Sequence, residues 1–162
     1  MSLTNCTPVL FVKDAKKAQS FYEKILGFKV KADFGGENII FEEGFTLWQI
    51  SDQDRISQTL GMGNIINPAI ASRFELCFET DELDTIYQTL KENDVKFLNE
   101  IHVELWGQRN IRFYDYDGHL IEVGEAMHIF LRRIYNEENQ NLEATSKRTF
   151  VAEDMLKEIL EL

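Results

Sequence analysis

Two stretches of the chain repeat one pattern, and this repeat limits the possible folds more than any other feature of the sequence. FYEKILGFKV at 21–30 corresponds to IYQTLKENDVKF at 86–97, and LWQI at 47–50 corresponds to LIEV at 120–123. Each copy is typical of a strand, an amphipathic helix and three further strands. Because the order of elements, the turns and the polar inserts agree, an internal duplication is favoured over a chance similarity of short amphipathic patterns.

The first copy is expected to occupy residues 5–51. Alternating apolar residues and glycine turns predict its strands at 7–13, 28–34, 38–42 and 45–51. Asp14 is a suitable N-cap for the helix AKKAQSFYEKIL, because a short carboxylate accepts hydrogen bonds from the free N–H groups of the first turn. Gly27 follows this helix and is typical of a C-terminal stop.

The second copy is expected at 72–125, after a linker at 52–71 that has no clear period and has room for a short helix. Its strands are predicted at 73–79, 95–102, 108–114 and 119–123. Thr80 or Asp81 is expected to cap the helix ELDTIYQTLKEN. The sequence DYDG at 115–118 predicts a tight turn between the last two strands, because short carboxylates bond nearby N–H groups and glycine takes a positive φ.

Residues 126–162 belong to neither copy and predict a helical appendage. Helices are expected at 126–135, 142–149 and 151–160. LEATSKRTFVAEDMLKEIL faintly resembles a helix-turn-helix, but this tail is acidic overall, which disfavours DNA as its target. A tail that covers a sheet or forms an oligomer interface is the favoured interpretation.

The composition excludes several classes of partner. The formal net charge is -11, and phosphate binding needs clustered Lys and Arg, so nucleic acid is not an expected partner. We find no long apolar run and no signal-peptide pattern, so we expect neither a membrane nor secretion. Cys6 and Cys77 lack metal-type spacing and are expected to be reduced thiols, which favours a cytoplasmic location.

Two stretches carry a resemblance to a known group of proteins. The first copy contains VKDAKKAQSFYEKILGF, and the second ends in WGQRNIRFYDYDGHLIEV, with its D-x-D-G-x-x-I-E ending. Together they closely resemble the vicinal oxygen chelate superfamily, which includes glyoxalases, extradiol dioxygenases and bleomycin-resistance proteins. The resemblance implies an α+β fold, in which two tandem βαβββ modules within residues 1–125 form a curved mixed sheet around a cavity. It also implies a small-molecule ligand in that cavity and a homodimer.

In metal-dependent members of this superfamily, four equivalent strand positions each supply a His, Gln or Glu ligand. The resemblance places Thr7, Gln49, Arg73 and Glu122 at these positions. Thr7 is a poor ligand, and the permanent cation of Arg73 repels a metal ion, so neither a metal nor another cofactor is expected. If a divalent metal does bind, Gln49 and Glu122 are the expected ligands.

The three histidines do not restore this ligand set, because none lies near either first strand. His119 follows a turn glycine and is expected to be solvated. His128 lies in the tail and is expected to be structural or on the surface. His102 precedes the WGQR turn and is close enough in sequence to reach the rim of the cavity.

The candidate ligand-binding residues are Gln49, Arg73, Glu75, Trp106, Arg109 and Glu122. Glu122 stands between two apolar neighbours, where a charge is costly unless it finds a partner. An ion pair with Arg73 across the cavity floor is the expected partner, and Glu75 adds a second carboxylate. The alternative is that these residues form a polar cluster that only fixes how the two modules meet.

Other side chains are expected to shape the cavity. The resemblance places Trp106 and Arg109 in a turn that borders it. Trp48 alternates with Gln49 and is therefore expected to point into the helix-covered core, while Phe11, Leu120 and Phe41 supply an apolar lining.

Three functions are open on these grounds. The first is a metal-free binding protein of the bleomycin-resistance kind, which takes a small, partly aromatic or cationic molecule. The second is a metal-dependent lyase or dioxygenase of the glyoxalase type, with Glu122 as a ligand and, if the chain is an enzyme, a possible base. The third is a protein-interaction module that uses the C-terminal helices. Fold resemblance alone does not decide among them.

Overall fold

The computed structural model describes residues 7–65 and 74–162. Contacts divide the described chain into two compact units. The first contains the described residues up to Glu75 together with Tyr114–Leu120, and the second contains Leu76–Phe113 and Ile121–Leu162.

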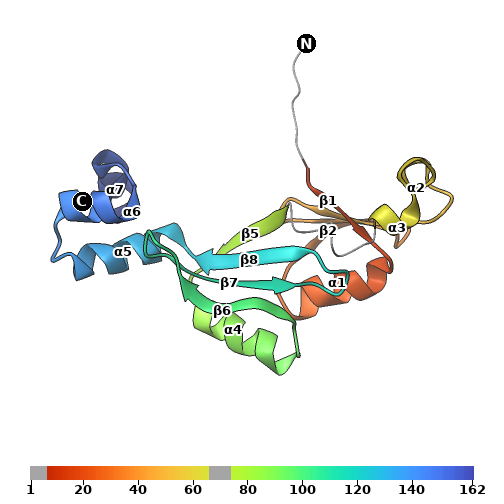
Figure 1. Ribbon diagram of the computed structural model, residues 1–162, viewed down its shortest axis with the longest axis horizontal. Coiled ribbons are helices and arrows are strands. Elements are labelled where there is room, and N and C mark those ends of the chain that lie inside the picture. Colours follow the sequence, from red (N-terminus) through yellow and green to blue (C-terminus); the bar gives the residue numbers. More distant parts are fainter. Residues whose placement is uncertain (1–6, 66–73) are drawn as a thin grey trace, which may run out of the picture. The chain divides into compact units, whose positions relative to one another are not determined.

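The first unit holds a four-stranded sheet and a helix that packs against it (Figure 1). Its elements are β1 (Val9–Val12), α1 (Ala15–Lys24), β2 (Val30–Phe34), β3 (Asn38–Phe41) and β4 (Thr46–Gln49). The strand order is β1-β4-β3-β2, in which β1 runs parallel to β4 and the other pairs are antiparallel. The chain from β1 to β4 therefore has the βαβββ order that the first copy of the repeat predicts.

Helix α1 begins directly after Asp14, as predicted, and ends at Lys24, two residues before the predicted end. The Asp14 carboxylate accepts a hydrogen bond from the N–H of Lys17 at 2.9 Å. Beyond the helix, Gly27 has a φ of 72°, a left-handed conformation that costs glycine little because it has no Cβ. The helix buries Phe21 and Tyr22. The predicted linker at 52–71 contains two short helices, α2 (Arg55–Leu60) and α3 (Met62–Ile65).

The second copy folds in the same order. Its elements are β5 (Glu75–Thr80), α4 (Leu83–Glu92), β6 (Phe97–Val103), β7 (Arg109–Tyr114) and β8 (Leu120–Glu125). The strand order, β5-β8-β7-β6, is the counterpart of the order in the first sheet. Two tandem βαβββ modules are therefore confirmed. Within the described residues, hydrogen bonds group the strands into two sheets of four rather than into one continuous sheet.

The predicted cap of the second helix is wrong. Glu82, not Thr80 or Asp81, is the N-cap residue of α4, and its side chain makes no capping hydrogen bond. Thr80 is still part of strand β5, because its carbonyl oxygen accepts a hydrogen bond from the N–H of Ala126 at 2.9 Å. Its hydroxyl oxygen instead accepts a hydrogen bond from the N–H of Glu82 at 3.1 Å.

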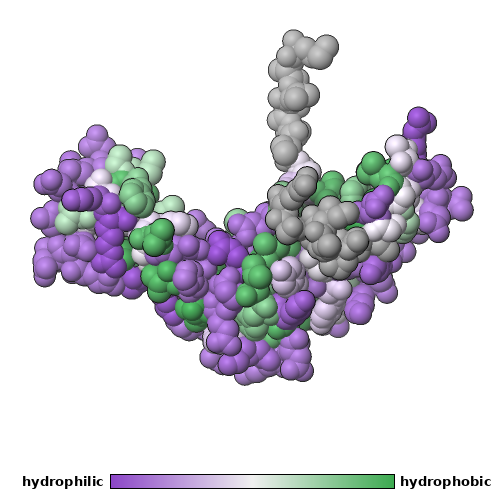
Figure 2. Space-filling model, viewed as in Figure 1, coloured by the Kyte–Doolittle hydropathy of each residue, from purple (hydrophilic) through white to green (hydrophobic). Residues whose placement is uncertain are grey.

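Three helices follow the second sheet, as the sequence predicts: α5 (Met127–Glu137), α6 (Leu142–Thr149) and α7 (Glu153–Leu160). We call them the tail. They share a buried core, against which Trp106 also packs; its fully enclosed members are Phe130, Leu131, Ile134, Leu156 and Leu160. Hydrophilic residues cover most of the tail surface that is visible in Figure 2. No helix among the described residues is both long and apolar enough to span a bilayer.

Candidate functional site

The two faces of the second sheet differ in chemistry. One face packs against α4, and the ring centroids of Tyr87 on α4 and Phe97 on β6 are 5.5 Å apart. This face carries the fully buried Ile111 and Phe113 of β7. Because side chains alternate along a strand, Asn110 and Arg112 of β7 lie on the opposite face. Glu122, between two buried residues of the neighbouring strand β8, also lies there.

Four side chains on this opposite face form a bonded group that we call the Glu–Arg–Glu cluster: Glu104, Asn110, Arg112 and Glu122. The Arg112 guanidinium donates to Glu104 Oε1 at 2.9 Å through Nη1 and pairs with Glu122 Oε2 through Nη2. The Asn110 amide donates to the same two oxygens, at 2.8 Å and 3.3 Å. One cation and one amide therefore hold two carboxylates in fixed positions.

The cluster brings two carboxylates together at the Arg112 guanidinium. Its charged side chains are 15–22% exposed, so water reaches them only in part. Hydrogen bonds from Arg112 and then from Asn110 lower the pKa of Glu104, with a smaller contribution from the charge of His102. Hence Glu104 stays ionised to lower pH than an ordinary glutamate.

The expected neutralisation of Glu122 by a guanidinium is met, within the described residues, by Arg112. Arg73, the partner proposed from the sequence, lies outside the described residues. Arg112 was missed although the predicted turn at 115–118 already paired the last two strands and its alternation with Phe113 placed it away from the core. Arg73 was preferred because the resemblance places it at a position equivalent to that of Glu122. His102 pairs with Asn110 across β6 and β7 and is exposed.

The predicted directions of Gln49 and Trp48 are wrong. Gln49 lies on the same face of β4 as the fully buried Leu47, and its Oε1 accepts a hydrogen bond from the N–H of Ala15 at 2.8 Å. It therefore secures the first turn of α1. Trp48 lies on the other face, with its ring 5.7 Å from that of Phe11. A shift of one residue in the assumed alternation exchanges the two faces of a strand.

Phe41 is also misassigned as cavity lining. It is fully buried on the α1 face of the first sheet, where its ring lies 5.6 Å from Tyr22 and stacks on Phe45 at 4.8 Å. Leu120, by contrast, alternates with Ile121 and shares the face of Glu122.

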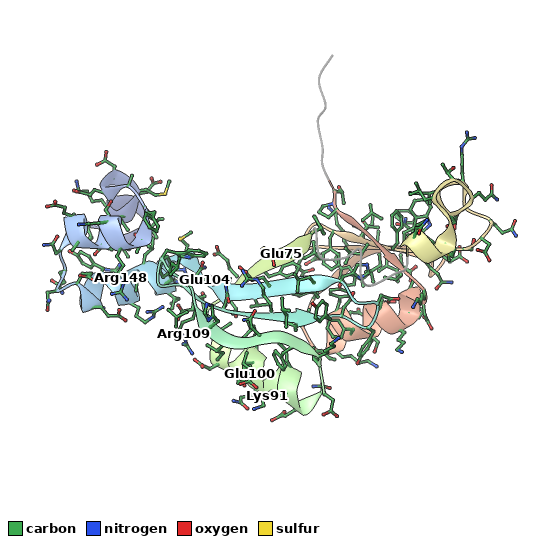
Figure 3. The ribbon with its side chains drawn as sticks, viewed as in Figure 1. Glu75, Lys91, Glu100, Glu104, Arg109 and Arg148 are labelled. Atoms are coloured by element: carbon green, nitrogen blue, oxygen red, sulfur yellow. The ribbon has the colours of Figure 1, made fainter. Side chains whose placement is uncertain are left out.

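The WGQR turn contributes to packing rather than to the cluster. Trp106 packs against the tail core, and its Nε1–H donates to Gln108 Oε1 at 3.1 Å. Arg109 stands two residues before Ile111 on β7 and so shares its α4 face, where it pairs with Asp84 at 2.7 Å and Glu125 at 3.5 Å. Figure 3 labels Arg109 at the start of β7, Glu104 in the preceding turn, and the remaining candidate, Glu75, on β5.

His119 is not solvated, contrary to expectation. Its side chain is 21% exposed, and its Nδ1 lies 2.8 Å from Asp115 Oδ2, which also accepts a hydrogen bond from the Tyr22 hydroxyl at 2.8 Å. Burial alone would lower the pKa of His119, but the hydrogen bond and charge of Asp115, together with the charge of Asp117, raise it above its ordinary value. His128 is exposed, as expected, 3.6 Å from Asp81.

Gln49 and Glu122, the expected metal ligands, do not fit a metal ion in the arrangement that they have. The Gln49 oxygen is bonded to the start of α1, and Glu122 is paired with a guanidinium that would repel a divalent cation. Thr7 is exposed. In the part of the chain that the structure describes, no three His, Cys, Asp or Glu side chains are grouped to hold a metal.

Comparison with known proteins agrees with the fold. A model of the glyoxalase-like domain family matches residues 5–128, so the chain belongs to this family and to the vicinal oxygen chelate superfamily. It is a glyoxalase/bleomycin-resistance-like protein, and residues 129–162 lie outside the match.

Individual relatives give no specific activity. The chain is 29% identical over 117 residues to the uncharacterized protein YraH of Bacillus subtilis (strain 168), covering 70% of this chain and 91% of YraH. A protein of unknown function from Agrobacterium tumefaciens str. C58 is 31% identical, with a TM-score of 0.66 over 78% of this chain and 97% of that one. A glyoxalase/bleomycin resistance protein/dioxygenase from Nocardioides shares the fold alone. It is 18% identical, with a TM-score of 0.54 over 77% of this chain and 85% of that chain.

Proposed function

We propose that this protein binds a small organic cation at the Glu–Arg–Glu cluster and does so without a metal ion. The observation that supports the proposal is the partly buried Glu104 carboxylate, which Arg112 and Asn110 hold in place beside Glu122. A partly buried carboxylate attracts a positive ligand more strongly than the same carboxylate in open water does.

Each member of the cluster has a role in this proposal. Arg112 and Asn110 occupy Oε1 of Glu104, while its Oε2 accepts no hydrogen bond from the described residues. That oxygen is therefore available to an amidinium, guanidinium or ammonium donor, and a charge-assisted hydrogen bond is among the stronger polar contacts. The lowered pKa of Glu104 keeps this acceptor ionised at neutral pH and also at lower pH than an ordinary glutamate.

The other two functions have less support. A metal-dependent lyase or dioxygenase would require Gln49 and Glu122 to leave the hydrogen bonds and ion pair that they make. Protein binding through the tail stays a prediction, as do the homodimer and the cytoplasmic location.

Three probes of nearly equal shape and different charge test the proposal: benzamidinium, neutral benzamide and benzoate. Titration of ¹⁵N-labelled protein is expected to show saturable shifts of the Asn110 side-chain amide with benzamidinium, much weaker shifts with benzamide and none with benzoate. Equal affinity for benzamidinium and benzamide would show that the cluster does not select for charge.

Two glutamine variants locate the site. Glu104→Gln removes the available charged acceptor and is expected to weaken benzamidinium binding about tenfold, the equivalent of 1.4 kcal/mol. Glu100→Gln is the matched control, since Glu100 is an exposed carboxylate on β6 outside the cluster. Equal loss in both variants would point to the general acidity of the protein rather than to the cluster.

A further inference from the structure

Glu104 is the one charged member of the cluster that does not come from a strand. It begins the turn Glu104–Gly107 between β6 and β7. The N–H of Gly107 donates to the carbonyl oxygen of Glu104 at 2.8 Å. The N–H of Glu104 donates to the carbonyl oxygen of Gln108 at 2.9 Å. The position of the Glu104 carboxylate therefore depends on the conformation of this turn.

Helix α5 of the tail holds the turn at two points. Arg133 Nη2 donates to the carbonyl oxygen of Gly107 at 2.8 Å and also to Glu125 Oε2 at 2.6 Å. Ile134 lies so close that a Cβ on Gly107 would stand 2.8 Å from its Cδ1, and Gly107 has a φ of 98°. A side chain at residue 107 would thus be opposed both by backbone strain and by α5.

Trp106 ties the same turn to the tail and to the sheet. Its ring packs against the tail core, and its Nε1–H donates to Gln108. The Gln108 amide in turn donates to the carbonyl oxygen of Glu125 at 2.8 Å. The three consecutive residues 106–108 of this turn are therefore held by contacts with β8 and the tail.

We propose that helix α5 is part of the binding site, and that Arg133 and Ile134 are positioning residues that hold the Glu104 carboxylate against Arg112 and Asn110. The ligand role of the cluster rests on the proposed function, but the positioning is measurable without any ligand. Arg133 and Ile134 lie beyond the residues matched by the family model, so the tail adds to the shared fold a means of adjusting this site.

The test measures the pKa of the Glu104 carboxyl group by ¹³C NMR in the full chain, with benzamidinium affinity as a second readout. Arg133→Lys keeps a cation for Glu125 but cannot reproduce the paired donors of the guanidinium. We expect the pKa of Glu104 to rise by about half a pH unit toward its ordinary value as its hydrogen bonds lengthen, and benzamidinium to bind several-fold more weakly. Gly107→Ala is expected to act in the same direction and more strongly.

Arg148→Lys is the matched control, because the ion pairs of Arg148 join Glu137 and Glu138 within the tail. It is expected to leave both the pKa of Glu104 and the affinity for benzamidinium unchanged. If Gly107→Ala does not fold, Arg133→Lys decides the question.

An unchanged pKa of Glu104 in folded Arg133→Lys protein would overturn the proposal, even if the parent binds benzamidinium. A raised pKa in a protein that never binds benzamidinium would support the positioning role and refute the proposed function. The positioning role and the proposed function can therefore be refuted independently of each other.

Discussion

Replacing Glu125 with glutamine is predicted to destabilise the second unit by about 2 kcal/mol. The Glu125 side chain is 6% exposed and lies between Arg133, at 2.6 Å, and Arg109, at 3.5 Å. Removing one partner of a buried ion pair costs roughly 3–5 kcal/mol when the remaining charge is left alone. Here both arginines are about 30% exposed, and each keeps a second carboxylate: Arg133 keeps Glu137, and Arg109 keeps Asp84. We therefore expect a smaller loss, near the cost of one charged hydrogen bond, about 2 kcal/mol.

The assay is urea unfolding followed by the fluorescence of Trp106 in a Trp48→Phe background, because the sequence has only these two tryptophans. Trp106 then reports the second unit alone. Glu137→Gln is the control: its side chain is 43% exposed, and the expected loss is below about 0.5 kcal/mol. If Glu125→Gln cost no more than this control, the reasoning from burial between two arginines would be refuted.

Two further predictions concern the group around Asp115 in the first unit. Because the folded-state pKa of His119 is raised above 6.5, its contribution to stability should be complete below pH 6.5 and decline as the pH rises through the folded-state pKa. His119→Gln should remove this pH dependence, which urea unfolding at a series of pH values measures. Tyr22→Phe deletes a buried hydrogen bond to Asp115 and should cost about 1–3 kcal/mol in the same assay, and a loss within error of zero would mean that water replaces the hydroxyl.

The sequence predicted best those elements whose signals are local. The Asp14 cap set the start of α1 correctly, and the predicted helix at 142–149 coincides with α6. These features depend on the hydrogen-bonding and steric properties of a few adjacent residues. Strand existence was likewise clear from alternation, and the repeat predicted that both modules would share one topology.

The side chains of the site were harder to predict, because they depend on which face each strand presents and on which strands are neighbours. Gln49 was expected to be a ligand because the resemblance places it at a metal position, but it bonds the first turn of α1. Glu122 was correctly singled out as a charge that needs a partner. Arg112 was not assigned to it, although the turn predicted between β7 and β8 already made these strands neighbours. The predictions for Arg73 concern a residue outside the described ranges.

The central claim is that a cation binds at the Glu–Arg–Glu cluster without a metal, and one comparison tests it most directly. Benzamidinium affinity is measured on protein treated with a chelator, and again after addition of zinc, nickel, manganese or ferrous ions. The account predicts the same affinity in every case, since Glu104 and Glu122 are paired with Arg112 and need no metal. Binding that is lost with chelator and restored by one of these ions would contradict it.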